Sequence, residues 1–182
     1  MPTTISILRG INVSGQKKIL MADLKALYEQ RGFKDVTTYI QSGNVVFRTD
    51  KKLTNAELAQ IIEKDIKTQF GFDVPVITRT SEEWNKIITA NPFMKKKEIN
   101  SDKLHVTFLS QEPDKANIKI AESFSYLPDE FSINGSEVFL HIPDSYGNTK
   151  LSNNFFENKL KVSATTRNWK TVITLAEIVS AG

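Results

Sequence analysis

The feature that most constrains this chain is an order of secondary-structure signals that occurs twice. In the first eighty residues, four β-rich runs alternate with two helical patterns, and the helical patterns end at Gly32 and Gly71. The β-rich runs are TISIL at 4–8, VTTYIQ at 36–41, NVVFRT at 44–49 and VPVIT at 74–78. The resulting β-α-β-β-α-β order is that of a ferredoxin-like plait.

The same order returns after a connector. Thr80 and Glu83 form a capping-box pattern for one short helix, and the stretch at 91–102 contains Pro92 and a lysine run. Strand signals follow at 103–110, 130–133, 136–142 and 162–165, with helical patterns at 114–123, at 153–160 and from Arg167. We therefore expect an α+β protein of two packed ferredoxin-like units with antiparallel sheets: residues 1–80, a helix and connector at 81–102, and residues 103–182 including the final helix.

Composition limits the classes of function. The chain has no cysteine, which excludes disulfides, a thiolate nucleophile and a cysteine zinc site, and fits a reducing cytoplasm. It also lacks a signal-peptide pattern and any run of 18 apolar residues, so we expect a cytoplasmic protein that does not bind membranes.

Charge is segregated along the chain. The 24 basic and 21 acidic residues leave a net +3, too small to indicate nucleic-acid binding by itself. Residues 9–34 contain six basic and two acidic side chains, a net charge of +4. Residues 112–144 contain two basic and seven acidic side chains (−5), and residues 150–170 contain five basic and one acidic side chain (+4).

Several motifs occur in a fixed order: LRGINVSG at 8–15, Met21, TYIQSGNVVF at 38–47, NPF at 91–93, YGNTKL at 146–151 and TTRNW at 165–169. With these motifs the chain resembles the bacterial domain of unknown function 1697 family. It departs from the usual family pattern at Ser14 and at Asn148 and Thr149. The resemblance implies a cytoplasmic α+β protein with plait-like halves, and it implies no activity.

The segment from Gly10 to Lys18 lies between a predicted strand and helix, as a phosphate-binding loop does. Gln16 and Lys17 stand where that loop needs Lys and then Ser or Thr, so nucleoside triphosphatase chemistry is not predicted. Basic side chains and helix amino-end N–H groups would still attract an anion. The alternative is that the glycines form a tight turn and the lysines are only solvated.

Topology brings a second segment to this loop. In β-α-β-β the first two strands are parallel, so Arg9 to Gly15 and Gln41 to Asn44 should emerge at one edge of the sheet. The candidate residues for binding a phosphate-bearing small molecule there are Arg9, Asn12, Lys17, Ser42 and Asn44. The alternative for Asn12 and Asn44 is that they hydrogen-bond turn backbones.

The carboxyl-terminal part supplies two further candidates, Lys150 before one predicted helix and Arg167 at the start of the last. A positive charge at a helix amino end opposes the dipole, so Arg167 is expected to pair with an anion or with a carboxylate of residues 112–144. Thr165 or Thr166 is the expected N-cap of that helix, and Trp169 a packing residue.

No metal, cofactor or reaction is predicted. His105 and His141 are expected on the same non-core face of adjacent strands, without a third ligand at metal spacing. No catalytic triad or placed carboxylate pair is present, so enzymatic status is left open.

Ser6, at the position of the first-strand aromatic of RNA-binding plaits, disfavours RNA binding on the sheet face. Two alternatives therefore stand beside the small ligand: a module that binds nucleic acid nonspecifically, with the lysines at 95–97 contributing, and an enzyme acting on a phosphorylated substrate. The sequence assigns no oligomeric state.

Overall fold

The computed structural model describes all residues 1–182 and divides into two compact units. One comprises Met1–Lys86 with Thr174–Gly182, and the other Ile87–Ile173. The boundaries fall within helices α3 (Ser81–Ala90) and α6 (Trp169–Ala181). None of the helices is both long and apolar enough to span a bilayer.

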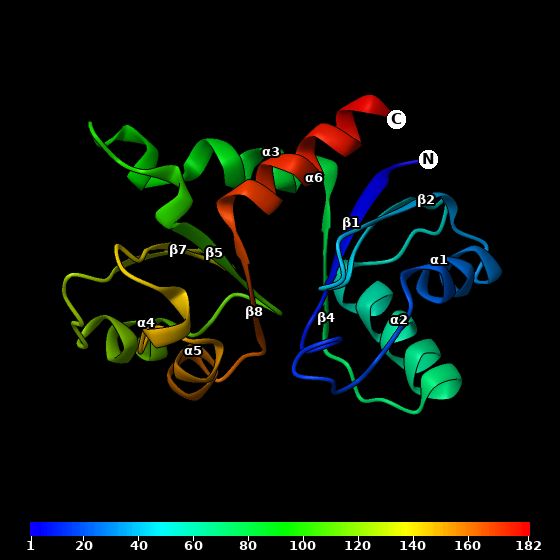
Figure 1. The fold of residues 1–182 in the computed structure, drawn as a ribbon, viewed down its shortest axis with the longest axis horizontal. Helices are drawn as coiled ribbons and strands as arrows, with labels where there is room; N and C mark the ends of the chain where they lie inside the picture. The colour runs from blue at the N-terminus through cyan, green and yellow to red at the C-terminus, as the bar shows by residue number, and fades with distance from the viewer. The chain divides into compact units, whose positions relative to one another are not determined.

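The first unit is a ferredoxin-like plait. Its elements are β1 (Thr3–Leu8), α1 (Met21–Gln30), β2 (Lys34–Tyr39), β3 (Asn44–Arg48), α2 (Asn55–Phe70) and β4 (Val76–Thr80). The antiparallel sheet has the order β2-β3-β1-β4, and α1 and α2 lie on one of its faces (Figure 1).

The second unit repeats this arrangement. Its elements are the short 3-10 helices η1 (Pro92–Lys95), η2 (Ser101–Lys103) and η3 (Tyr146–Asn148), the strands β5 (Leu104–Leu109), β6 (Glu130–Asn134), β7 (Glu137–His141) and β8 (Ala164–Asn168), and the helices α4 (Lys115–Glu122) and α5 (Asn153–Leu160). The sheet order is β6-β7-β5-β8, again antiparallel. The expectation of an α+β fold with two ferredoxin-like units is confirmed.

Alternation along β1 shows how the first core forms. Leu8 packs with the helices, and Ser6, on the same face, shares a hydrogen bond of 2.7 Å with the Tyr28 hydroxyl. Ile5 and Ile7 lie on the opposite face and are also fully buried. Removing a large apolar side chain from water contributes about 1.5 to 3 kcal/mol, so this burial holds the sheet and helices together.

Local signals fix most helix ends. Thr54 and Glu57 form the predicted capping box of α2, and Gly71 ends that helix in the left-handed conformation. Leu20 continues the apolar spacing of Leu24 and Leu27, which predicts it on the packed face of α1. This prediction is wrong, because Leu20 precedes the helix as N-cap and its side chain is 70% exposed.

The two units also share polar details. The Thr78 hydroxyl donates to the backbone carbonyl of Asn55, the first residue of α2, at 2.9 Å. In the second unit the Thr166 hydroxyl donates to Oδ1 of Asn153, the first residue of α5, at 2.7 Å. Each link ties the last strand of a plait to the start of its second helix.

The last strand is longer than the sequence predicted. Strand β8 continues to Asn168, so α6 begins at Trp169 and not at Arg167. Thr165 and Thr166 are strand residues, and Asn168 caps the helix by accepting the Thr171 N–H at 2.8 Å.

The expectation that both histidines share one face was also wrong. His105 pairs with Leu140, which belongs to the core under the helices, whereas His141 pairs with Leu104 on the other face. Both faces of β5 and β7 are lined by buried apolar side chains, so alternation alone does not distinguish them. The two rings therefore form no common site.

Candidate functional site at the loop edge

The side-chain amide of Asn12 joins the β1–α1 loop to the β2–β3 turn. Its Nδ2 donates to the carbonyls of Ile19 at 2.9 Å and Gln41 at 2.8 Å, and its Oδ1 accepts the Ile19 N–H at 2.9 Å. The Leu8 N–H also donates to the Gly43 carbonyl at 2.9 Å. The predicted neighbourhood of the two segments is confirmed. We call residues 9–20 and 40–44 together the loop edge.

The backbone of the loop edge is unusually rich in left-handed residues. Seven of the thirteen residues with positive φ in the chain lie here: Gly10, Asn12, Ser14, Gly15, Lys17, Ile40 and Gly43. At Gly43 (φ 85°) a Cβ would stand 2.7 Å from Cδ1 of Ile11, so only glycine fits. Such concentrations of sparsely populated conformations persist where the surrounding structure fixes them, and they cluster at functional sites.

Three of the seven exposed large hydrophobic residues lie in the same place. Val13, Leu20 and Ile40 are 57%, 70% and 48% exposed. The Asn12 amide joins Asn12, Ile19 and Gln41 by hydrogen bonds. Val13, Leu20 and Ile40 are the respective sequence neighbours of these residues, so each Cα lies about 3.8 Å from the Cα of a joined residue. The loop edge therefore presents three aliphatic side chains to solvent.

Two of these residues are poor choices for their local structure. Leu20 is an N-cap that makes no side-chain hydrogen bond to the helix, where Ser, Thr, Asp or Asn would stabilise α1. Ile40 is β-branched and has φ 50°, a conformation strained for its type. Residues that break local rules without a structural gain are expected at functional positions.

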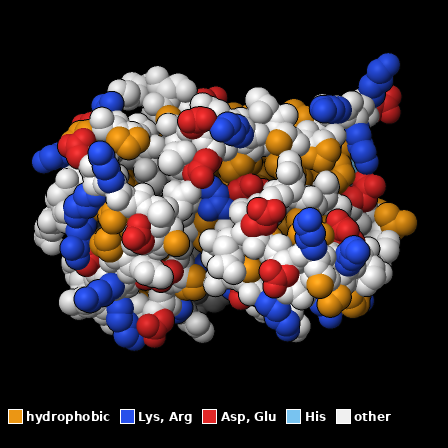
Figure 2. Space-filling model, turned by 180° about the vertical axis from the view of Figure 1, so that it is seen from behind, with side chains coloured by type: hydrophobic (Ala, Val, Ile, Leu, Met, Phe, Trp, Pro, Cys, Tyr) orange, Lys and Arg blue, Asp and Glu red, His pale blue; other side chains and the backbone are white.

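Basic residues belong to the same loop edge. Lys17 donates from Nζ to the Asp73 carbonyl at 2.5 Å, Lys18 is exposed, and Arg9 is half-buried with its N–H bonded to the Pro75 carbonyl. The hydrogen bond and charge of Lys67 lower the pKa of the Asp73 carboxyl, and the charge of Lys17 adds to this. Figure 2 shows further Lys and Arg side chains along the left margin, where the first unit lies.

Asn44 and Ser42 serve the turn itself. Asn44 is buried, and its Nδ2 donates to the Tyr39 carbonyl at 2.9 Å and to the Ser42 hydroxyl at 3.1 Å. Asn44 and Asn12 thus make the backbone and turn contacts of the alternative, structural interpretation. Their direct contact with a ligand stays a prediction.

The comparison with a phosphate-binding loop predicts that this loop leads directly into a helix amino end. The structure does not have this arrangement. Helix α1 begins only at Met21, and Val13 to Gln16 form a tight turn closed by the Gln16 N–H and the Val13 carbonyl at 2.9 Å. The buried Ile19 separates this turn from the helix. Any anion at the loop edge would therefore be held by side chains and turn amides.

The two second-tier candidates lie in the other unit. Lys150 is exposed, and its Nζ is 5.5 Å from the ring centroid of Tyr126. Arg167 is buried on β8 and donates from Nη1 to the Thr166 carbonyl at 3.0 Å, and burial lowers its pKa to about 10. The starts of α5 and α6 are capped by Ser152 and Asn168, so the structure gives neither helix an uncapped end for an anion.

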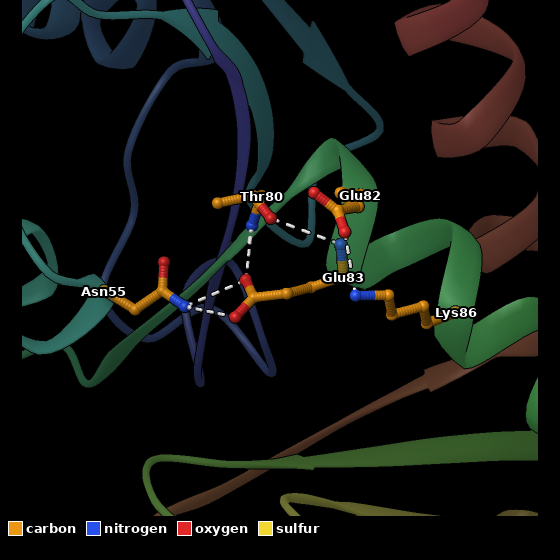
Figure 3. Close-up of polar contacts among 5 residues, drawn as sticks. All are labelled: Asn55, Thr80, Glu82, Glu83 and Lys86. Carbon is orange, nitrogen blue, oxygen red and sulfur yellow. Dashed lines mark hydrogen bonds and ion pairs between the residues drawn. The ribbon is translucent and has the colours of Figure 1, made fainter.

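A polar cluster where β4 meets α3 is structural (Figure 3). Glu83 accepts hydrogen bonds from Nδ2 of Asn55 at 2.9 and 3.1 Å and from the Thr80 N–H at 2.7 Å, and its own N–H donates to the Thr80 hydroxyl. Burial raises the pKa of the Glu83 carboxyl, but these bonds outweigh it and lower the pKa. Glu82 points to Lys86, 2.8 Å away. This is the predicted capping box.

Sequence reasoning missed Val13, Leu20 and Ile40 as functional candidates. One signal was present for Leu20, because no capping residue precedes Met21. The exposure of Val13 and Ile40 follows from turns whose conformation depends on Asn12, and no local pattern shows it.

Comparisons with known proteins place the chain among relatives. A family model described as a protein of unknown function, DUF1697, matches residues 1–139. The chain is similar in structure to a conserved bacterial protein, SP0830, from Streptococcus pneumoniae, with TM-score 0.78, 21% identity and coverage of 97% of this chain and 98% of that one. At this identity the likeness shows the fold alone. A search of curated proteins finds no match.

Proposed function

Since the chain belongs to the DUF1697 family, whose description states no function, we propose from its own geometry that the loop edge binds an anionic, phosphate-bearing small molecule. A nucleotide or a phosphorylated metabolite is the class of ligand that fits. The observation that carries the proposal is the Asn12 link, which gathers basic and exposed aliphatic side chains on one rigid edge.

Two kinds of contact define the ligand. Arg9 and Lys17, with Lys18 beside them, favour a negatively charged group, because charge-assisted hydrogen bonds to phosphate are among the strong ones. Leu20 and Ile40 favour an apolar or planar part, since each would lose solvent exposure on binding. A ligand with both parts, such as a nucleotide, uses the whole edge.

The polar turn residues have a supporting role in this proposal. Asn12 joins the loop to the turn, and Asn44 holds the turn through the Tyr39 carbonyl and the Ser42 hydroxyl. Because these hydrogen bonds hold the loop edge in place before a ligand arrives, less conformational entropy is lost on binding. The cysteine-free chain suits the cytoplasm, where we place this binding.

Nonspecific nucleic-acid binding is the second candidate, and the spread of Lys and Arg side chains in Figure 2 favours it. Against it, the face of the first sheet opposite the helices carries Ile5, Ile7 and Ile77, all buried, and its one aromatic side chain is Tyr39 on the edge strand β2. An enzyme acting on a phosphorylated substrate would need the same binding step, and turnover of a bound compound would identify it.

The proposal is tested by thermal denaturation with ATP, AMP, fructose 1,6-bisphosphate, inorganic phosphate and a single-stranded oligothymidylate. A ligand at about 100 times its Kd adds roughly 2.7 kcal/mol, which raises the Tm by roughly 5 to 10 °C. We expect a rise with one small phosphate compound, abolished in Arg9→Ala and Lys17→Ala.

Lys52→Ala is the matched control, because Lys52 is exposed and follows the opposite end of β3. A rise caused only by the oligonucleotide, and erased by salt, would assign the edge to nucleic acid. No rise with any probe, or equal rises in both loop variants and wild type, would overturn the proposal.

A further inference from the structure

The second unit contains a pocket of about 280 Å³ that the loop edge does not involve. One wall is the turn from Tyr126 to Asp129, and the other is the segment from Asp144 to Lys150. The volume is close to the lower limit for small-molecule sites, so the pocket suits a compact metabolite.

Hydrogen bonds fix both walls. The Asp129 N–H donates to the Tyr126 carbonyl at 3.0 Å, which closes the first turn. The Thr149 hydroxyl donates to Oδ2 of Asp129 at 2.5 Å and joins the two walls. The Asn148 N–H donates to the Ser145 carbonyl at 3.1 Å within the second wall. The pocket is therefore preformed.

Charges of both signs line the pocket without neutralising each other. The Lys150 ammonium lies over the Tyr126 ring and forms no ion pair, and the Asp144 carboxylate forms none either. Only the backbone carbonyl of Asp144 has a cationic partner, Nζ of Lys103 at 3.0 Å. The carboxylates of Asp129 and Asp144 would repel a phosphate, and the Lys150 ammonium would repel a simple cation. Neither ligand therefore suits the pocket.

Part of the first wall is apolar. Leu127 is 76% exposed, the largest exposure among the large hydrophobic residues named above, and Pro128 follows it. A ligand for this pocket thus needs a negative group, a positive group and a short apolar body. An α-amino acid with an aliphatic side chain has all three.

We propose that this pocket binds a zwitterionic α-amino acid, with its carboxylate at Lys150, its ammonium at Asp144 and its side chain against Leu127. The site is independent of the function proposed for the loop edge, since every residue in it belongs to the second unit. Asp129 is occupied by Thr149 and acts as a structural part of the floor.

Three probes with one alkyl body test the proposal: L-leucine, 4-methylpentanoate, which lacks the ammonium, and 3-methylbutylamine, which lacks the carboxylate. Titrations followed by the backbone amide NMR signals of residues 144–150 give the affinities. We expect L-leucine to shift these signals and to bind at least about tenfold more tightly than either analogue, a difference of about 1.4 kcal/mol.

Variants separate the two charges. Lys150→Gln should weaken L-leucine about tenfold and leave 3-methylbutylamine unchanged, whereas Asp144→Asn should weaken L-leucine and leave 4-methylpentanoate unchanged. Lys119→Gln, an exposed lysine on α4, is the matched control and should bind like wild type. Absent shifts at 144–150, equal affinity for the three probes, or competition by inorganic phosphate would overturn the proposal.

Discussion

The Nδ2 atom of Asn12 donates a hydrogen bond of 2.8 Å to the carbonyl of Gln41, twenty-nine positions along the chain. This bond crosses from the loop after β1 to the turn after β2, two connections that emerge at the same edge of the first sheet. The same amide holds the Ile19 backbone. One side chain therefore fixes the geometry on which the proposed binding surface depends.

Asn12→Ala should lower the free energy of unfolding by about 2 to 3 kcal/mol. The change removes three hydrogen bonds and places alanine at φ 55°, where a Cβ is strained. Asn12→Gly removes the same bonds without the strain, so its loss should be smaller. Urea denaturation followed by circular dichroism measures both. A loss below about 0.5 kcal/mol in both variants would show that the link is dispensable.

Gly43→Ala and Gly135→Ala form a matched pair, because both glycines occupy the hairpin turn of their plait with positive φ. At Gly43 a Cβ would stand 2.7 Å from Ile11 Cδ1 and 2.9 Å from Leu8 Cβ, whereas at Gly135 nothing lies within 4 Å. We expect Gly135→Ala to cost about 1 kcal/mol from strain and Gly43→Ala to cost about 1 to 3 kcal/mol more from overpacking. Equal thermal midpoints in the two variants would contradict this packing.

Glu83→Gln should destabilise the protein at neutral pH by about 1 to 2 kcal/mol, because the carboxylate accepts hydrogen bonds from Asn55 and Thr80. Burial raises the pKa of Glu83, but the hydrogen bonds lower it by more, so the folded-state pKa is below that of the unfolded chain. The stabilisation is then present above about pH 4.5 and is lost as pH falls through the lowered pKa.

Urea denaturation at pH 7 and at pH 3 tests this prediction. The wild type and Glu83→Gln should differ at pH 7 and converge at pH 3. Glu82→Gln is the control, since Glu82 is exposed and contacts only Lys86 among the residues drawn in Figure 3. It should change stability little at either pH. A constant difference between wild type and Glu83→Gln would show that the carboxylate charge is unimportant.

His105 should make stability fall with acidification. Its ring stacks on Tyr146 with a centroid distance of 4.7 Å, and burial lowers its pKa below 6.5. Because the pKa of His105 is lower in the folded state, the contribution of the neutral ring to stability is fully present above pH 6.5. It is lost as the pH falls through the folded-state pKa of His105. The free energy of unfolding of wild type should therefore decrease relative to His105→Phe between pH 6.5 and 5. Parallel pH curves for the two proteins would refute this.

Much of the fold was predictable because its signals are local. The Thr54 capping box, Gly71 and the β-rich runs each specify an element from a few neighbouring residues, and the doubled order of elements then specifies the plait. The neighbourhood of the loop and the turn followed from strand direction alone. Fold-level reasoning therefore located the loop edge without any contact information.

The composition of the site was less predictable. Leu20 continues the helical spacing of Leu24 and Leu27, but the helix begins one residue after it, so periodicity assigned it to the wrong surface. The faces of His105 and His141 depend on the pairing register of β5 with β7. The pocket at Lys150 depends on a turn more than twenty residues earlier in the chain.

The measurement that tests the central claim most directly is the effect of Leu20→Ser on stability and on binding in the same experiment. Serine at this N-cap should raise the free energy of unfolding by about 0.5 to 1 kcal/mol, because leucine makes no capping hydrogen bond there. If the loop edge binds the ligand found among the phosphate probes, the ligand-induced rise in Tm should shrink in this more stable variant. An undiminished rise would show that the ligand binds elsewhere.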